Sequence, residues 1–194
     1  MIEASLGYKT YDPTNLTDTD FNIDSPAQWR LNKAKAGGGA LINLGLYCIQ
    51  SCRYVLGEEP VAVSAQFGAV NNKIRFSQVE ESITWQMEFP SGAMSNCVTS
   101  YGFGVDRFYA SADEGFFELS PALSYGPFKG RTGKGELNFP IINQQATQLD
   151  EIGKLILAEK PLPNHITGEE GLKDIRIIQA VYQAARTGKR VSLI

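Results

Sequence analysis

The stretch AGGGALINLGLYCIQSCRYVLGEEP, residues 36–60, decides the fold of this chain of 194 residues. Three glycines precede a run of helix length from Ala40 to Leu56, and Gly57 is a typical residue to end a helix. Apolar side chains occupy two sides of this run, so the spacing predicts a buried helix. Asn43 and Tyr47 lie four residues apart on one face. In a buried helix they must find polar partners or face a cavity.

Period-two alternation follows this helix and predicts strands. Apolar residues occupy every second position in 61–67 and in 83–89, and a Pro-Ser-Gly turn then leads into an alternating run over 93–101. This pattern predicts a strand followed by a hairpin. A second hairpin is expected over 107–119 and a strand within 2–10. The glycine-rich segment 120–140 is expected to be a loop with few strands.

Helices are expected at both ends of the chain. Ser25-Pro26 predicts the start of a short helix that reaches Leu31, after a polar loop over 11–24. A helix over 145–159 and another from the Thr167-x-x-Glu170 capping box to Gly188 are expected near the C-terminus. The residues expected to face inward on these two helices are Leu149, Ile152, Leu155 and Ile156, then Leu172, Ile175, Ile178 and Tyr182.

This order of elements predicts one α+β domain over residues 1–194. Consecutive hairpins with helices at both ends indicate an open, predominantly antiparallel sheet with helices packed on one face. We expect the other face to be apolar and to pair with a second copy of the chain, because large apolar faces rarely stay in water.

Composition narrows the function. With 18 Lys and Arg against 21 Asp and Glu, the chain lacks the basic surface that nucleic-acid binding requires. It contains no apolar run of membrane length and shows no leader at its first residues, so the expected location is cytoplasmic. Three cysteines and a single distant histidine, His165, indicate reduced, buried thiols and no metal site.

Known catalytic and phosphate-binding patterns do not fit. Gly37-Gly38-Gly39 has Ile42 where the dinucleotide pattern requires glycine, and the segment 130–135 lacks a Ser or Thr after Lys134. A histidine-based triad has no base near a nucleophile. The adjacent carboxylates Glu80-Glu81 and Glu169-Glu170 have structural explanations. Asn43 and Tyr47 remain: spacing alone allows either core residues with satisfied polar groups or a site.

Several segments, in order along the chain, carry a resemblance. They are Gln28-Trp29-Arg30-Leu31, the glycine helix through Glu58-Glu59-Pro60, residues 79–87 and 89–93, and Gly168-Glu169-Glu170-Gly171-Leu172-Lys173-Asp174. Together they resemble the C-terminal domain of the glucose-fructose oxidoreductase, inositol dehydrogenase and rhizopine-catabolism (Gfo/Idh/MocA) oxidoreductases. The closest resemblance is to sugar dehydrogenases like glucose-fructose oxidoreductase.

The resemblance implies a function for the full-length parent. In the family this domain closes over NAD or NADP held by an N-terminal Rossmann domain, and hydride is removed from a sugar or cyclitol hydroxyl. Tyr47 matches the position that exchanges the hydroxyl proton, so it is the catalytic candidate. Asn43 stands where the family has Asp and is a substrate-binding candidate, with Arg30 and Arg107. Trp29, Gly38 and Gly39 are candidates for lining the cofactor.

Two further expectations follow from the resemblance. No Rossmann unit is visible in these residues, and the family lysine that partners the tyrosine lies in that domain; Glu159-Lys160-Pro161 is interpreted as a coincidence at a helix end. This chain alone is therefore expected to bind no cofactor and to be inactive, while forming a homodimer or larger homo-oligomer through its sheet. The alternative is a non-catalytic sugar-binding or assembly module.

Overall fold

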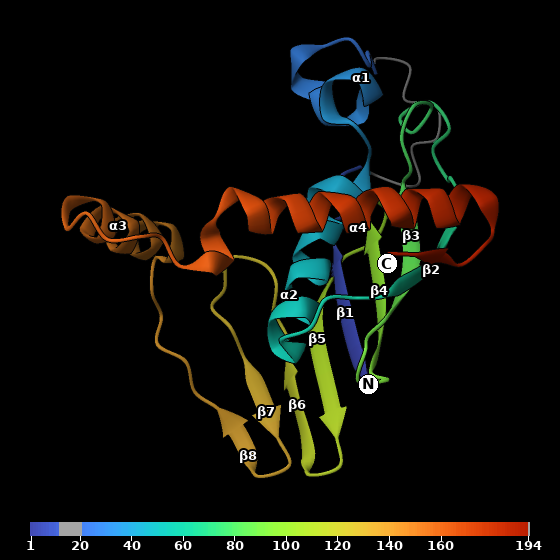
Figure 1. The fold of residues 1–194 in the computed structure, drawn as a ribbon. Helices are drawn as coiled ribbons and strands as arrows, with labels where there is room; N and C mark the ends of the chain where they lie inside the picture. The colour runs from blue at the N-terminus through green and yellow to red at the C-terminus, as the bar shows by residue number, and fades with distance from the viewer. Residues whose placement is uncertain (12–20, 194) are drawn as a thin grey trace.

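The computed structural model describes residues 1–11 and 21–193. In this part of the chain a single sheet has nine strands in the order β8-β7-β6-β5-β1-β4-β3-β2-β9 (Figure 1). Neighbouring strands are antiparallel except β1 and β4, which run parallel. The sheet does not close into a barrel, so the open, predominantly antiparallel sheet is confirmed.

The elements have the following bounds. The strands are β1 (Ile2–Gly7), β2 (Ala62–Phe67), β3 (Ser82–Glu88), β4 (Met94–Ser100), β5 (Val105–Ala112), β6 (Gly115–Leu119), β7 (Gly130–Thr132), β8 (Gly135–Leu137) and β9 (Val191–Ser192). The α-helices are α1 (Lys33–Ala36), α2 (Leu46–Leu56), α3 (Gln144–Leu157) and α4 (Gly168–Thr187), with short helices η1 (Pro26–Leu31), η2 (Leu41–Gly45) and η3 (Asn164–Ile166).

Helices α2 and α4 cover one face of the sheet, α4 crossing the upper ends of the strands in Figure 1. The alternation read from the sequence places Ile83, Trp85 and Met87 of β3 on this covered face, where all three are buried. Helix α4 contributes Ile177, Ile178 and Val181 to the same core. The core therefore lies between β1–β4 and these two helices.

The glycine-led helix begins with a wide turn. Residues Leu41–Gly45 form a π-helix, and α2 continues from it to Gly57, whose φ of 66° is left-handed. The predicted helix is confirmed, but its burial on all sides is not: Tyr47, Tyr54 and Val55 are exposed. A π turn fits an extra residue into the helix, which shifts the register of the side chains that follow.

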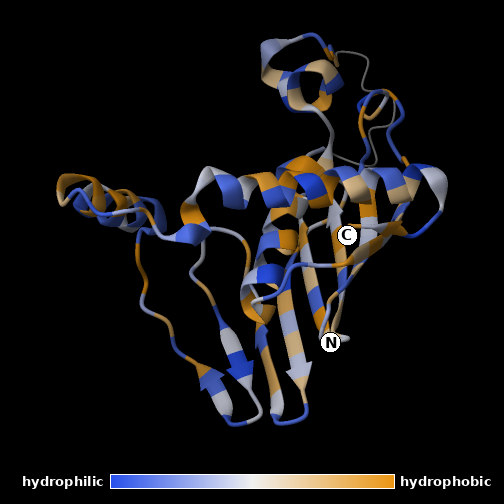
Figure 2. Cartoon of the chain, viewed as in Figure 1, coloured by the Kyte–Doolittle hydropathy of each residue, from blue (hydrophilic) through white to orange (hydrophobic). Residues whose placement is uncertain are grey.

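The two C-terminal helices differ from the expected packing. Figure 1 shows α3 standing away from the sheet. The inward placement is therefore wrong for Leu149 and Ile156, which are exposed, while Ile152 and Leu155 are half-buried; hydrophobic residues mark the helix in Figure 2. On α4 the predicted start is confirmed, since the Thr167 side chain accepts from the Glu170 amide. The reciprocal half of the capping box is not formed, because the Glu170 carboxylate binds Arg53 and Lys173. Leu172 and Ile175 are exposed.

Segment 120–140 also differs from the expected loop. It contains the hairpin of β7 and β8, which extends the sheet beside β6. Each strand has three residues, too few for a periodic signal. The polar loop expected over 11–24 lies outside the described residues at 12–20. The short helix after Ser25 is present as η1, but the Ser25 side chain accepts no capping hydrogen bond.

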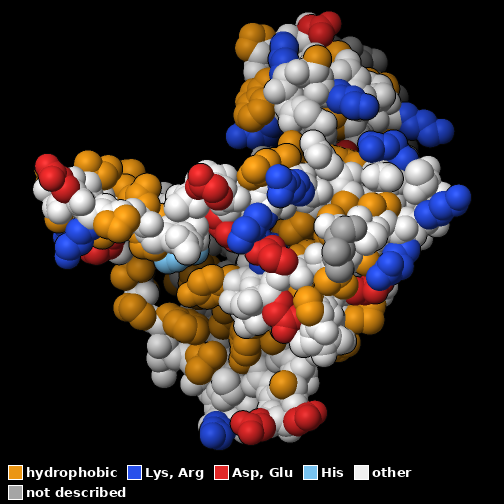
Figure 3. Space-filling view, in the orientation of Figure 1, with side chains coloured by type: hydrophobic (Ala, Val, Ile, Leu, Met, Phe, Trp, Pro, Cys, Tyr) orange, Lys and Arg blue, Asp and Glu red, His pale blue; other side chains and the backbone are white. Residues whose placement is uncertain are grey.

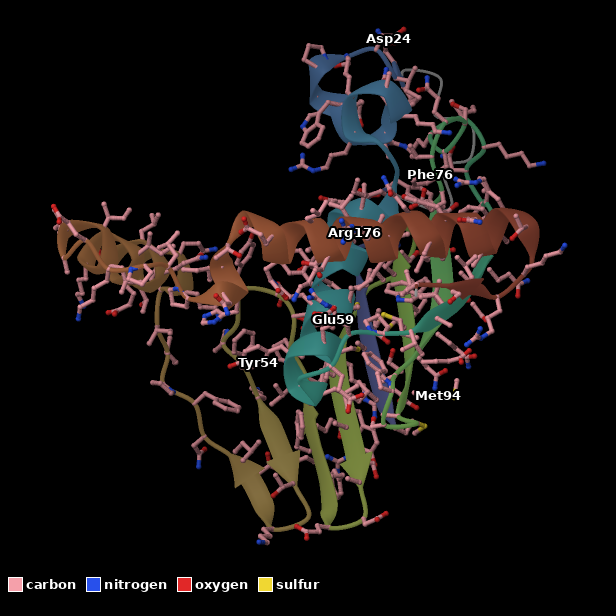
Figure 4. The ribbon with its side chains drawn as sticks, viewed as in Figure 1. Asp24, Tyr54, Glu59, Phe76, Met94 and Arg176 are labelled. Atoms are coloured by element: carbon pink, nitrogen blue, oxygen red, sulfur yellow. The ribbon has the colours of Figure 1, made fainter. Side chains whose placement is uncertain are left out.

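A buried ion cluster joins α2 to α4. The Arg53 side chain is 3% exposed and contacts Glu59 at 2.7 Å, Glu170 at 2.5 Å and Asp174 at 2.5 Å. Lys173 adds a contact to Glu59 at 2.9 Å. Figure 4 shows Glu59 beside α2 and below α4. A buried guanidinium needs this degree of pairing because an unpaired charge there is strongly destabilising.

The uncovered face of the sheet is polar, which corrects the expectation of an apolar face. Its side chains are hydroxyls and amides on the central strands, among them Ser5, Ser64, Gln66, Thr84, Gln86 and Asn96. Ion pairs continue this surface across β1, β5 and β6. Arg107 of β5 lies 2.7 Å from Glu3 of β1 and 2.6 Å from Glu118 of β6. The alternation that buries one side of each strand therefore leaves polar residues on the other.

Within the described ranges, no helix is long and apolar enough to cross a membrane, and no cluster of side chains has the make-up of a metal site.

We expect the ion cluster to make the fold sensitive to acid. Hydrogen bonding from Arg53 lowers the pKa of Glu59 from 4.5 to about 2. The ionised Glu59 therefore adds stability that is fully present above pH 4.5 and is lost as the pH falls toward about 2. In urea unfolding across this window, a Glu59→Gln variant should lose less stability than the parent as the pH falls.

The matched control for this measurement is Glu114→Gln, since Glu114 is exposed in the β5–β6 turn. Its pH dependence should follow that of the parent. An unchanged slope in the Glu59 variant would show that the pairing with Arg53 contributes nothing to the pH dependence of stability.

Candidate functional site

A small notch lies at the start of the glycine-led helix. It has a volume of about 100 Å³ and includes Trp29, Arg30, Gly38, Asn43 and Tyr101 in its lining. Three segments far apart in the sequence supply these residues: η1, the helix start, and the end of β4. The structure thus brings together four residues singled out in the sequence, namely Trp29, Arg30, Gly38 and Asn43.

Asn43 is held through Tyr101. The buried Tyr101 hydroxyl donates to the Gly39 carbonyl at 3.3 Å, and the Asn43 side chain also hydrogen-bonds to Tyr101. Burial raises the pKa of Tyr101 to about 12, while the bond from Asn43 and the charge of Arg30 lower it. Asn43 and Tyr101 both line the notch, so the polar end of the Asn43 side chain lies where a ligand would enter.

Trp29 and Arg30 form the outer wall of the notch. The Arg30 guanidinium lies over the Trp29 ring, 4.4 Å from the ring centroid, which is a cation–π contact. Trp29 is 42% exposed. The pair therefore presents a flat aromatic surface and a positive charge beside the Asn43 side chain, a combination that suits a polar ring compound.

Tyr47 lies one turn beyond Asn43 and is 41% exposed. Tyr47, Asp106 and Tyr125 are neighbours of Tyr8, which directly follows β1. Burial raises the pKa of Tyr8, and a hydrogen bond with Ser124 opposes this shift. The Asp106 carboxylate holds the adjacent loop by accepting from the amides of Ala122 at 2.8 Å and Leu123 at 2.7 Å.

Two predicted residues are placed differently from the rest. Arg107 lies on the uncovered face of the sheet, paired with Glu3 and Glu118, and is not brought to the notch. Neighbouring residues of a strand point to opposite faces, so Arg107 faces away from the side that carries Phe108. Gly39 lies at the helix start, but its amide already donates to Glu80 at 3.0 Å. It has no free donor to offer a cofactor.

Sequence reasoning missed Tyr101, Tyr8 and Asp106. Tyr101 ends the alternating run over 93–101, where a buried tyrosine is equally typical of a core. Tyr8 follows β1 and Asp106 lies in β5, two strands that pair only in the folded sheet, where Leu6 lies opposite Asp106.

A larger hollow lies further along α2. None of the predicted site residues that the structure describes lines it. Its volume is about 720 Å³, and Phe108, Phe117 and Leu119 form an apolar floor. Figure 3 shows apolar side chains gathered in this region between α3 and the lower strands. Tyr54 projects toward it from α2 (Figure 4).

The thiols take no part in either cavity. Cys48, Cys52 and Cys97 are free and buried, as expected. Burial raises the pKa of Cys48 and of Cys97 well above the usual range, which keeps both thiols protonated. Glu159-Lys160-Pro161 follows the end of α3, as predicted for a helix end that enters a linker.

Solved structures with this fold include several oxidoreductases and dehydrogenases, which defines the class. The chain is similar to the aldose-aldose oxidoreductase of Caulobacter crescentus, solved with glycerol, at 37% identity and a TM-score of 0.84. The match covers 99% of this chain and 55% of that one. Levoglucosan dehydrogenase, solved with NADH and levoglucosan, shares the fold at 17% identity and a TM-score of 0.74, over 100% of this chain and 58% of that one.

The GFO/IDH/MocA C-terminal domain matches residues 11–117, more than half of the chain, which therefore belongs to this family. Among curated proteins it is 27% identical to the NADP-dependent D-xylose 1-dehydrogenase of Haloarcula marismortui, over 98% of this chain and 54% of that protein. It is 25% identical to the D-glucoside 3-dehydrogenase of Escherichia coli, over 84% and 51% respectively. The chain spans about half the length of the curated relatives it matches.

We expect Tyr101 to be needed for the notch to keep its shape. A Tyr101→Phe variant loses the hydroxyl that joins Gly39 to Asn43, which should lower the free energy of unfolding by about 1–2 kcal/mol. Urea unfolding measures this change. Tyr54→Phe is the control, because Tyr54 is 77% exposed and its hydroxyl should contribute less than about 0.5 kcal/mol. Equal effects in both variants would contradict the assignment.

Proposed function

We propose that this chain is the substrate-binding and oligomerising domain of an NAD(P)-dependent oxidoreductase that oxidises a sugar or cyclitol hydroxyl by hydride transfer. The observation that carries the proposal is the notch, where Asn43, Arg30 and Trp29 meet beside the helix that bears Tyr47. Family membership and the sugar dehydrogenases among the relatives support it. In this proposal a dinucleotide-binding domain supplies the other wall of the site.

The residues at the notch fit a nicotinamide cofactor in part. Trp29 offers an exposed ring for stacking, and Gly38 has no side chain to block the approach of a flat group. Gly39 does not contribute a donor, because Glu80 already holds its amide. When bound, the cofactor would supply the acceptor of the hydride; the protein residues bind the substrate and move its proton.

The proposed roles rest on the family resemblance and on the placement of these residues. Asn43 accepts a hydrogen bond from a substrate hydroxyl through its carbonyl oxygen, and Arg30 donates to a second oxygen. Tyr47, as phenolate, takes the proton of the hydroxyl that is oxidised, and as phenol returns it in the reverse reaction. A phenol works as a base near neutrality only beside a cation. We propose that the family lysine of the dinucleotide-binding domain is that cation.

The proposal is tested by completing the enzyme. This chain would be joined to the part of the Caulobacter crescentus enzyme that it does not match, and sugar-dependent reduction of NAD or NADP would be measured. Activity is expected, and Tyr47→Phe should lower kcat by about 10²- to 10⁴-fold, since proton transfer by a positioned side chain contributes that much. Tyr54→Phe, on the same helix, should retain full activity.

The alternative function is a non-catalytic sugar-binding or assembly module. Asn43 favours it, because an amide cannot carry the charge of the family aspartate. The same assay separates the two: a folded fusion that binds sugar but reduces no cofactor would support the module. A Tyr47→Phe variant with full kcat would instead remove Tyr47 from the mechanism.

Oligomerisation is the second part of the proposal, through the uncovered sheet face. The resemblance supports a second subunit on this face, whose surface is polar and shallowly hollowed, with a volume of about 510 Å³. We expect light scattering to give twice the chain mass of 21.3 kDa. Replacing Thr84 and Gln86 together with Lys should return the mass to that of one chain, because like charges would then face each other across the interface.

A monomeric mass for the parent chain would contradict this interface. Replacing the exposed Leu149 on α3 with Lys is the control, since α3 lies away from the sheet and its charge should leave the mass unchanged.

A further inference from the structure

Two neighbouring residues, Tyr182 and Glu80, leave no space for a side chain at Gly38 and Gly39. A Cβ on Gly38 would lie 2.0 Å from the Tyr182 hydroxyl, and a Cβ on Gly39 would lie 2.2 Å from the Glu80 carbonyl oxygen. Both distances are far below van der Waals contact. The three glycines therefore allow the chain before β3 and helix α4 to approach the helix start directly.

Glu80 accepts hydrogen bonds from the backbone amides at the helix start. One carboxylate oxygen accepts from the Gly39 amide at 3.0 Å, and the other accepts from the Leu41 amide at 2.9 Å and from the Tyr182 hydroxyl at 2.8 Å. The Ala40 amide points to the Glu80 carbonyl at 3.4 Å. Three consecutive backbone amides at the helix start thus donate to Glu80.

Among the residues that the structure describes, no other side chain caps this helix. Ala40 occupies the cap position and has no group to accept a hydrogen bond. The first amides of a helix lack partners within the helix, and a negative charge beside them is favourable because of the helix dipole. The Glu80 carboxylate, which comes from the segment before β3, satisfies both requirements, which are normally met by the cap residue itself.

The same contacts reach the notch. Gly39, which Glu80 holds by its amide, accepts at its carbonyl from the Tyr101 hydroxyl at 3.3 Å and from the Asn43 amide at 3.3 Å. Tyr101 in turn binds the Asn43 side chain. A displacement of Gly39 would therefore move the Tyr101 hydroxyl and the Asn43 backbone, which together place the Asn43 side chain.

We propose that Glu80 is a positioning residue of the site: its carboxylate fixes the helix start and, through Gly39 and Tyr101, the orientation of Asn43. The meaning of this orientation rests on the proposed function, in which Asn43 binds the substrate. Glu80 does not touch the substrate itself. Its role differs from that of a simple helix cap, which would stabilise the helix without setting the direction of a side chain one turn away.

The test uses the whole chain, labelled with ¹⁵N, without sugar or cofactor. In Glu80→Gln the neutral amide has a single accepting atom, so the amides of Gly39 and Leu41 can no longer both be bound. We expect their hydrogen exchange to become at least about ten-fold faster. The side-chain amide signals of Asn43, identified by their loss in Asn43→Ala, should also shift.

The matched control is Glu88→Gln, at the other end of β3. It removes the same charge, and Glu88 contacts the exposed Arg190 at 2.7 Å, away from the helix start. This variant should leave the Asn43 signals and the exchange of Gly39 and Leu41 as in the parent. Glu80→Asp, which is shorter by one methylene, should protect one of the two amides and shift the Asn43 signals less than Gln does.

Unmoved Asn43 signals in a folded Glu80→Gln chain would overturn the proposal, and faster exchange alone would reduce Glu80 to a cap. If Glu80→Gln does not fold, the same comparison is made with Glu80→Asp, where unmoved signals again count against it. The experiment involves no substrate. Failure of the chain to bind sugar would therefore sink the proposed function and leave the positioning result standing.

Discussion

The space between the glycine-led helix and residues 80 and 182 is too small for any side chain, and the site depends on this close approach. The backbone of the helix start lies directly against another segment. Hydrogen bonds therefore fix its position, and no flexible side chain lies between the two segments that could repack. Glycine in a helix normally weakens it through lost conformational entropy. Here the loss is offset by a carboxylate that binds two amides and a phenol, a charge-assisted arrangement stronger than neutral pairs.

The sequence predicted the fold well where a pattern extended over many residues. The alternation in β3 and β4 and the length of α2 each hold for seven residues or more, so the type of each element and the buried side of the two strands followed directly. The errors occurred where an amphipathic pattern was real but the described chain provides no cover, as on α3. Periodicity shows which side of a helix is apolar, but it does not show what that side contacts.

The candidate site was predictable only in part, for a related physical reason. Asn43 and Tyr47 share a helix face, and that spacing is local. Tyr101 and Asp106 reach the site through pairing of strands distant in sequence, which a single sequence does not reveal. Arg107 illustrates the converse. A step of one residue along a strand reverses the face on which a side chain lies. Arg107 was predicted to line the pocket, but it lies on the other face of the sheet in an ion pair with Glu3.

The position of β1 in the sheet has a consequence for how the chain folds. Ile2 lies beside Ser95 of β4 and Ala110 of β5, so this strand is held in the middle of the sheet by segments that are synthesised much later. Contacts between residues so far apart in the sequence form slowly, because the chain loses the entropy of closing a long loop before the contacts add stability. During synthesis β1 must wait unpaired on the ribosome while local hairpins form. Its apolar residues Ile2, Ala4 and Leu6 are then open to chaperones or to mispairing with other chains.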